Sequence, residues 1–353
     1  MRQLLIKKFK FITTFLESQM QINNFTTIVL STAFLTACGG GGGGNDGPAP
    51  VAATAALTST TQDVAAQEVV STALAPLELV QTLTGAQTTD EGALFRFALA
   101  QKSKLPTYLM NASKNSTLVG VVQTETVACT YGGSLYISAS VANPNGEPTA
   151  GDSATITGNN CVEADGTISG SLRLTFNSLS GNFNTDYYSA SITLSFDNLA
   201  IASAQINVRA NGSFALAEAA NGYNNLQQTY STPSLSVSAD YAGEARTRTL
   251  SGFQATATRT SGANDSYATS YSLNGAVTSS AMASQTLMFN TITPFVEFSD
   301  DLYPSSGVLL ITGAANAQLR LTAINSSQVT QELDANGDGS FEGNKTVYWS
   351  SLL

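Results

Sequence analysis

Alternation of apolar and polar residues runs through most of the chain after about residue 117. It constrains the fold more than any other feature of the sequence. A period of two places the apolar residues on one face of a strand, so the pattern predicts half-buried antiparallel strands with the other face in water. The clearest segments are Leu172–Phe176, Ile192–Phe196, Ala204–Val208, Leu235–Tyr241, Phe253–Ala257 and Leu319–Ala323.

Five dipeptides that end in glycine recur along this region, and three of the four gaps between them are near 40 residues. We interpret them as lying at or near strand starts, in a meander with two strands per repeating unit. Coincidence in a glycine-rich chain is the alternative. The dipeptides are Ser169-Gly170, Asn211-Gly212, Ser251-Gly252, Asn274-Gly275 and Thr312-Gly313.

Residues 59–106 have a helical pattern instead. Apolar residues recur there at steps of three and four, which predicts an amphipathic helix that Thr60 and Asp63 cap, Pro76 kinks and Gly85 ends. A second helix is expected from Asp90 to about Lys102. Thr88 and Glu91 have capping-box spacing for its start, and Pro106 lies just beyond its end.

We therefore predict a mainly β, α+β fold, with a large antiparallel curved sheet or barrel-like meander and one or two N-terminal helices packed against it. A closed sheet would fill its own interior, whereas an open sheet needs the helices on its concave side. The alanine-rich first helix favours the open sheet. The expected segments are a signal peptide at 1–37, a flexible tether at 38–58, helices at 59–106 and a β domain at 107–353.

The N-terminus has the pattern of a secretory signal. Four basic residues precede an apolar run of thirteen residues, Phe25–Ala37, which is too short for a membrane-spanning helix of ~20 residues. Translation from Met20 is an alternative that would remove the basic residues. Leu35, Thr36, Ala37 and Cys38 then resemble the lipobox of bacterial lipoproteins. An ordinary secretory signal with a chance cysteine is the competing interpretation.

The lipobox resemblance implies cleavage before Cys38 and attachment of several acyl chains to it, which together make a lasting membrane anchor. Residue 39 is glycine and not aspartate, which by the same resemblance implies the outer membrane, on its periplasmic face or at the cell surface. The run Gly39–Gly44 and the residues to Pro50 predict a flexible tether between this anchor and the folded part.

Composition excludes several functions. Removal of residues 1–37 takes away four basic residues and one acidic residue, leaving a net charge of about −13, so we reject nucleic acid as a partner. The chain has no histidine, which excludes histidine-based triads and histidine metal ligands. With Cys38 assigned to the anchor, Cys129 and Cys161 are expected to form a disulfide in an oxidising compartment, free thiols being the alternative.

One segment has the character of a metal site. Asp334, Asn336, Asp338, Ser340 and Glu342 place oxygen ligands at alternate positions, with Gly339 sixth, a pattern that suits Ca²⁺. The twelfth position is Lys345 and not glutamate, and the flanks look like strands, so an EF-hand is not expected. The alternative is a hairpin loop without metal, because Asn-Gly and Asp-Gly are strong turn formers.

The other candidates are less specific. Acid pairs at Asp90-Glu91 and Asp300-Asp301 are more often solvated residues than a glycosidase pair. Tyr187, Tyr188, Tyr223 and Tyr230 suit either a sugar or peptide groove or ordinary strand edges.

Another combination of residues resembles a loose group of uncharacterised proteobacterial lipoproteins, and covers most of residues 120–353. It consists of Cys129 before Gly132-Gly133, Gly151 to Ser153, Asn160-Cys161, Ile168 to Leu172, the Leu333 to Gly339 loop, and Trp349 near the end. The charged face usual around the last strands of that group is sparse in this chain. The group carries no activity over to it.

We expect a non-catalytic envelope lipoprotein with a binding or structural role, which in one version holds an apolar ligand between sheet and helices. This architecture resembles periplasmic lipoprotein carriers built as half-barrels around helices. A surface-displayed module that binds a protein partner is the alternative, and a carboxylate-dependent hydrolase ranks third.

Overall fold

The computed structural model describes residues 54–76, 92–114, 121–142, 149–164, 166–182, 185, 187–203, 206–222, 225–241, 244–262 and 266–353. Within these residues two α-helices, α2 (Gln62–Leu74) and α3 (Gly92–Lys114), precede fourteen strands. The strands are β1 (Val121–Ala128), β2 (Gly132–Val141), β3 (Ser153–Glu163), β4 (Gly166–Asn182), β5 (Tyr187–Ala202), β6 (Ile206–Asn221), β7 (Leu226–Tyr241), β8 (Glu244–Ser261), β9 (Tyr267–Ser279), β10 (Gln285–Phe298), β11 (Ser306–Thr312), β12 (Gln318–Asn325), β13 (Gln328–Asp334) and β14 (Gly343–Tyr348).

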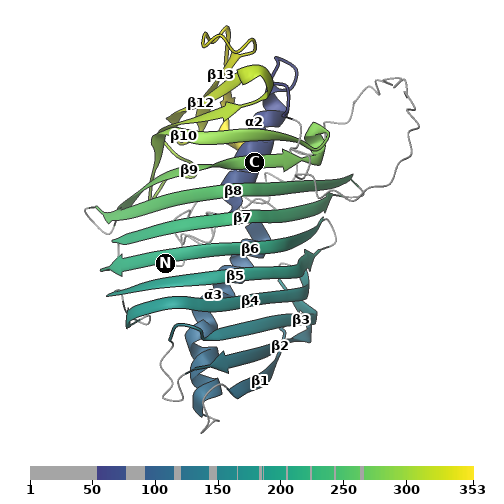
Figure 1. Ribbon diagram of the computed structural model, residues 1–353, viewed down its shortest axis with the longest axis vertical. Coiled ribbons are helices and arrows are strands. Elements are labelled where there is room, and N and C mark those ends of the chain that lie inside the picture. Colours follow the sequence, from purple (N-terminus) through teal and green to yellow (C-terminus); the bar gives the residue numbers. More distant parts are fainter. Residues whose placement is uncertain are drawn as a thin grey trace, which may run out of the picture. The chain divides into compact units, whose positions relative to one another are not determined.

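The strands form one antiparallel sheet in strict sequence order, from β1 to β14. Within the described residues β1 pairs only with β2 and β14 only with β13, so the sheet is open, and the barrel-like alternative is wrong. Figure 1 shows both helices running across the strands on one face of the sheet. We call that face the inner face and the opposite, solvated one the outer face.

The alternation of the sequence sorts the side chains between these two faces as predicted. Leu172, Phe176, Ile192 and Leu194 are fully buried on the inner face, beside α3. The core continues with Phe214 and other apolar residues in the later strands. The mainly β, open-sheet fold expected from the alternation is confirmed.

The glycine dipeptides do not mark strand starts, so that interpretation is wrong. Gly170, Gly212 and Gly252 lie inside β4, β6 and β8, each with a positive φ, and the strand register shifts beside each of them. A Cβ on Gly170 would lie 2.0 Å from the carbonyl oxygen of Asn198, the residue of β5 that also has a positive φ. The near-40-residue spacing of these three glycines thus reflects a positive-φ glycine beside a register shift in β4, β6 and β8, every second strand of the meander.

The helices also differ from expectation at their ends. α2 has Thr61 at its N-cap, without a capping side chain, and the Thr61 hydroxyl donates to the carbonyl of Ala56 instead. α2 ends at Leu74, before Pro76, and Leu77, Val80 and Gly85 lie outside the described residues.

α3 does not stop near Lys102 but continues through Pro106 to Lys114. Buried Leu105 and Leu109 pack against the sheet on either side of the proline. This burial offsets the backbone hydrogen bond that proline cannot make. The helical segment therefore extends beyond the expected boundary at residue 106.

The last residues of the expected tether are part of the fold. The Ala55 N–H donates to Thr286 of β10, and the Ala55 carbonyl accepts from the N–H of Ala314 after β11. Leu57 is 1% exposed. The part of 38–58 that the structure describes, from residue 54 onward, is therefore bound to the sheet.

Candidate functional site

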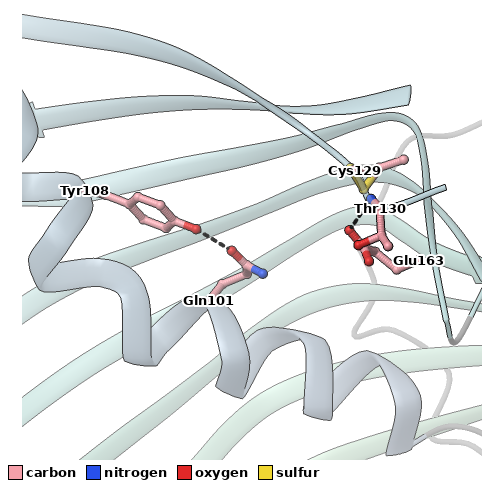
Figure 2. The surroundings of a disulfide bond; sticks show 6 residues. Gln101, Tyr108, Cys129, Thr130 and Glu163 are labelled. Carbon is pink, nitrogen blue, oxygen red and sulfur yellow. Dashed lines mark hydrogen bonds between the residues drawn. A yellow bond between two sulfur atoms is a disulfide. The ribbon is translucent and has the colours of Figure 1, made fainter. Parts of the chain in front are cut away.

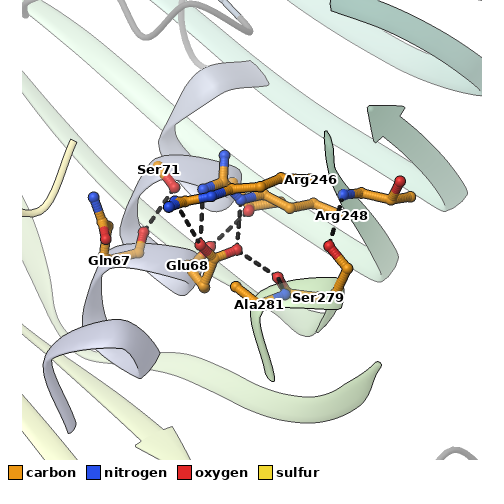
Figure 3. A network of polar contacts seen from close by, with 10 residues as sticks. Gln67, Glu68, Ser71, Arg246, Arg248, Ser279 and Ala281 are labelled. Atoms are coloured by element: carbon orange, nitrogen blue, oxygen red, sulfur yellow. Dashed lines mark hydrogen bonds and ion pairs between the residues drawn. The ribbon is translucent and has the colours of Figure 1, made fainter. Parts of the chain in front are cut away.

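A buried ion pair joins α2 to the inner face (Figure 3). Glu68 of α2 accepts hydrogen bonds from Nε and Nη2 of Arg248 in β8 at 2.6 and 2.9 Å, and from the Ser279 hydroxyl at 2.6 Å. Nη1 of Arg246 lies 3.8 Å from Oε1 of Glu68. Burial alone would raise the pKa of Glu68, but the hydrogen bonds and charge of Arg248 hold it below its ordinary value.

A second buried pair joins α3 to the sheet with the charges reversed. Lys102 of α3 lies 2.7 Å from the carboxylate of Glu218 in β6. Tyr188 of β5 donates to the same carboxylate at 2.9 Å, and the Gln228 amide of β7 donates to it at 3.3 Å. Each of these two helices is thus held to the sheet by a buried charged pair, in which the acid and the base already bind each other.

Aromatic side chains fill the space between α3 and the middle strands. The ring of Phe95 packs edge-on against Phe196 and Phe214, with centroids 6.0 and 6.2 Å apart. Phe214 stacks on Phe253, which contacts Phe289. These side chains are at most 4% exposed, so this part of the interior is occupied by the protein itself.

Two adjoining hollows lie on the outer face, and together we call them the outer trough. The larger, about 520 Å³, lies over β7 to β10, and the smaller, about 380 Å³, over β5 to β8. Thr229 and Thr256 line both. The outward-facing lining side chains are uncharged and mostly carry hydroxyl or carboxamide groups. Sequence patterns could not reveal this trough, because serine and threonine occupy the outer face almost everywhere.

The disulfide expected between Cys129 and Cys161 is present, with Cα atoms 5.4 Å apart (Figure 2). It joins the end of β1 to β3 and spans 32 residues, which corresponds to roughly 3–4 kcal/mol of stabilisation through chain entropy. Glu163 lies nearby and accepts a hydrogen bond from the Thr130 N–H at 3.1 Å. Because both sulfurs are in the disulfide, this group offers no thiolate to a metal.

The proposed calcium ligands lie in the hairpin loop between β13 and β14. Asp334, Asp338 and Glu342 each place a carboxylate oxygen within 4.8 Å of the others. Buried Asp334 accepts from the N–H groups of Gly337 and Gly339 at 2.7 and 2.8 Å. The flanks are strands, as expected, and Lys345 pairs with Asp63 of α2.

Other carboxylates and amides of this loop also have partners within it. The Asn336 amide donates to Asp338 and Glu342, and the Ser340 N–H bonds to Asp338 and holds its pKa below the ordinary value. The loop therefore gathers the oxygen donors that a hard cation requires, in a turn that its own hydrogen bonds also stabilise.

The structure separates the tyrosine candidates. Tyr187 is exposed, Tyr188 takes part in the Glu218 pair, and Tyr230 is buried in the core. Tyr223 lies outside the described residues. The side chains of Tyr187 and Tyr188 thus have different environments, and the three described tyrosines do not form one groove.

The acid pairs are also divided. Asp301 accepts from the Phe298 N–H in the turn after β10, beside Asp300, and Asp90-Glu91 lies outside the described residues. Cys38, the signal peptide and the glycine run lie outside them as well.

Glu297 is a buried acid that sequence reasoning missed. It occupies an inner-face position of β10 and is 2% exposed, and in the described part of the chain neither carboxylate oxygen has a hydrogen-bond partner. Burial, with a contribution from the charge of Asp301, raises the pKa of Glu297 to about 8. Its place in the alternation of β10 could have identified it as an inward-facing acid.

Among the described helices, none has the length and apolar character required to span a membrane. Neither protein-family models nor curated protein sequences nor solved structures match this chain.

Proposed function

We propose that the chain is a non-catalytic lipoprotein of the bacterial envelope, anchored in the outer membrane through Cys38, with a binding or structural role. The lipobox pattern and glycine run support the anchor. The observation that carries the role is the pairing of both helices with the inner face through Glu68–Arg248 and Lys102–Glu218. This pairing leaves the outer face of a wide sheet for contact with a partner.

Two of the buried acids, Glu68 and Glu218, support a non-catalytic role. Glu68 and Glu218 each bind a cationic side chain, and such pairs hold elements together and do not shuttle protons to a substrate. Hydrolysis by carboxylates needs two acids that face each other across a substrate. Asp300 and Asp301 instead share one turn after β10.

The version with an apolar ligand between helices and sheet would require the rings around Phe95 to separate. Native mass spectrometry of residues 51–353, exported to the periplasm and purified without detergent, tests it. This segment forms one compact unit of the chain. A bare mass supports a packed interior, whereas a co-purifying lipid-sized mass would assign the carrier role.

Display at the cell surface, for contact with a partner, is the second candidate, and the outer trough favours it. Protease treatment of whole cells tests this candidate. Cleavage in intact cells would place the sheet outside, and protection until the outer membrane is opened would place it in the periplasm.

A further inference from the structure

The larger hollow of the outer trough lies where the pairing of β9 with β10 is interrupted. β9 and β10 pair at Val277–Leu287 and again at Tyr271–Phe295, and the register shifts between these two points. Thr291 of β10 bridges the interval with its side chain. Its hydroxyl accepts from the Leu273 N–H at 2.9 Å and donates to the Leu273 carbonyl at 3.1 Å. A side chain has thus replaced a backbone pair, and the larger hollow opens beside it.

The trough has a uniform chemistry. Its outward side chains include Thr229, Gln254, Thr256, Ser272, Asn274 and Asn290. Each can donate and accept hydrogen bonds, and none is charged. Glu218, the one acid among its described lining residues, points its carboxylate to the inner face, where it pairs with Lys102.

These properties exclude most ligand classes. Apolar ligands would leave the hydroxyl and amide groups without partners. An extended peptide adds to the free edge of a sheet, whereas each strand under the trough has a neighbouring strand on both sides. Nucleic acids and acidic polymers need a basic surface, and this chain has a net charge of −10.

We propose that the outer trough binds an uncharged oligosaccharide. Sugar hydroxyls donate and accept as the trough side chains do, and binding them requires no charge to be desolvated. Five strand spacings from β5 to β10 give a length of about 24 Å, enough for several sugar units. This proposal deepens the binding role proposed above and rests on it.

The test uses the full chain, purified from membranes in a mild detergent. The probes are neutral hexasaccharides of glucose, xylose and N-acetylglucosamine, with an oligogalacturonate as the acidic comparison, and binding is measured by saturation-transfer NMR and calorimetry. Thr256→Trp fills the centre of the trough. Thr247→Trp, at another exposed site on β8, is the matched control, and tryptophan is tolerated well in strands.

We expect at least one neutral hexasaccharide to bind and the acidic oligomer not to bind. Thr256→Trp should weaken binding about tenfold or more, the equivalent of one or two lost hydrogen bonds, and Thr247→Trp should not. No binding of any neutral probe, or binding that Thr256→Trp leaves unchanged, would overturn the proposal. Acylation of Cys38 is measured on the same protein, so failure of the anchor and failure of the ligand are seen separately.

Discussion

Glu68 of α2 and Arg248 of β8 are 180 residues apart in the chain and meet in a buried, two-hydrogen-bond ion pair at 2.6 and 2.9 Å. The Glu68 side chain has no exposed surface, and that of Arg248 is 6% exposed. A charge buried to this degree depends on its partner, because removal of one partner leaves the other uncompensated.

Glu68→Ala should therefore lower the free energy of unfolding by about 3–5 kcal/mol. Urea denaturation followed by circular dichroism measures it. Glu332→Ala is the matched control, since Glu332 makes the same two-hydrogen-bond contact with Arg320 at a partly exposed site and should contribute about 1 kcal/mol or less. Equal losses in the two variants would show that the buried pair does not hold α2 to the sheet.

The pH dependence of this pair has a definite sign. Because the pKa of Glu68 is lowered in the folded protein, its stabilising contribution is present above its ordinary pKa of 4.5 and is lost as the pH falls through the lower folded value. The difference in stability between the wild type and Glu68→Ala should therefore shrink in acid. A difference that stays constant from pH 7 to acid would contradict this assignment.

Glu297 should make the stability of the fold depend on pH in the opposite direction. Its pKa is about 8 in the folded protein and 4.5 ordinarily, so its stabilising contribution is complete below 4.5 and is lost as the pH rises to about 8. Within this window it should reduce the stability by about 1.4 kcal/mol per pH unit. Urea midpoints measured across the window should fall for the wild type and much less for Glu297→Gln. Glu125→Gln, at an exposed site, should follow the wild type.

Gly170 should be the more sensitive of two bulge glycines. Gly170→Ala would place a Cβ 2.0 Å from the Asn198 carbonyl oxygen, whereas Gly252 has open space around its Cβ position. Gly252→Ala should therefore show only the left-handed backbone penalty of about 1–2 kcal/mol. We expect Gly170→Ala to lose clearly more in thermal denaturation. A smaller loss at Gly170 would mean that the β4–β5 bulge can rearrange.

Calcium should raise the melting temperature of the folded chain if the β13–β14 loop binds it. A ligand present at 100 times its dissociation constant stabilises by about 2.7 kcal/mol. Asp338→Asn and Glu342→Gln remove two of the three clustered carboxylates and should abolish the shift. A melting temperature that millimolar calcium leaves unchanged would assign the loop to its own hydrogen bonds alone.

The strand pattern could be predicted because it is local. Leu172, Leu174 and Phe176 alternate with polar residues, and this local pattern predicts that they lie on the buried face of the strand. All three are buried as expected. The turn between residues 334 and 342, common to the calcium-site and metal-free interpretations, could also be predicted, because its Asn-Gly and Asp-Gly pairs determine it locally.

Features that depend on contacts between distant segments could not be predicted from the local sequence pattern. Ser169-Gly170 has the composition of a turn, but it lies inside β4, opposite a bulge in β5 where the Asn198 carbonyl approaches the Gly170 backbone closely. Pro106 has the sequence character of a helix end, and burial of Leu105 and Leu109 overrode it. The Lys102–Glu218 pair spans 116 residues, and no local pattern links its two members.

Mass spectrometry of the N-terminal peptide, on protein extracted from bacterial membranes, decides whether the chain is anchored through Cys38. We predict a mature chain that begins at Cys38 and carries diacylglycerol and an amide-linked acyl chain. Cys38→Ser should abolish both the added mass and the membrane association. A mature chain with an unmodified cysteine, or one that begins elsewhere, would contradict the assignment as a lipoprotein.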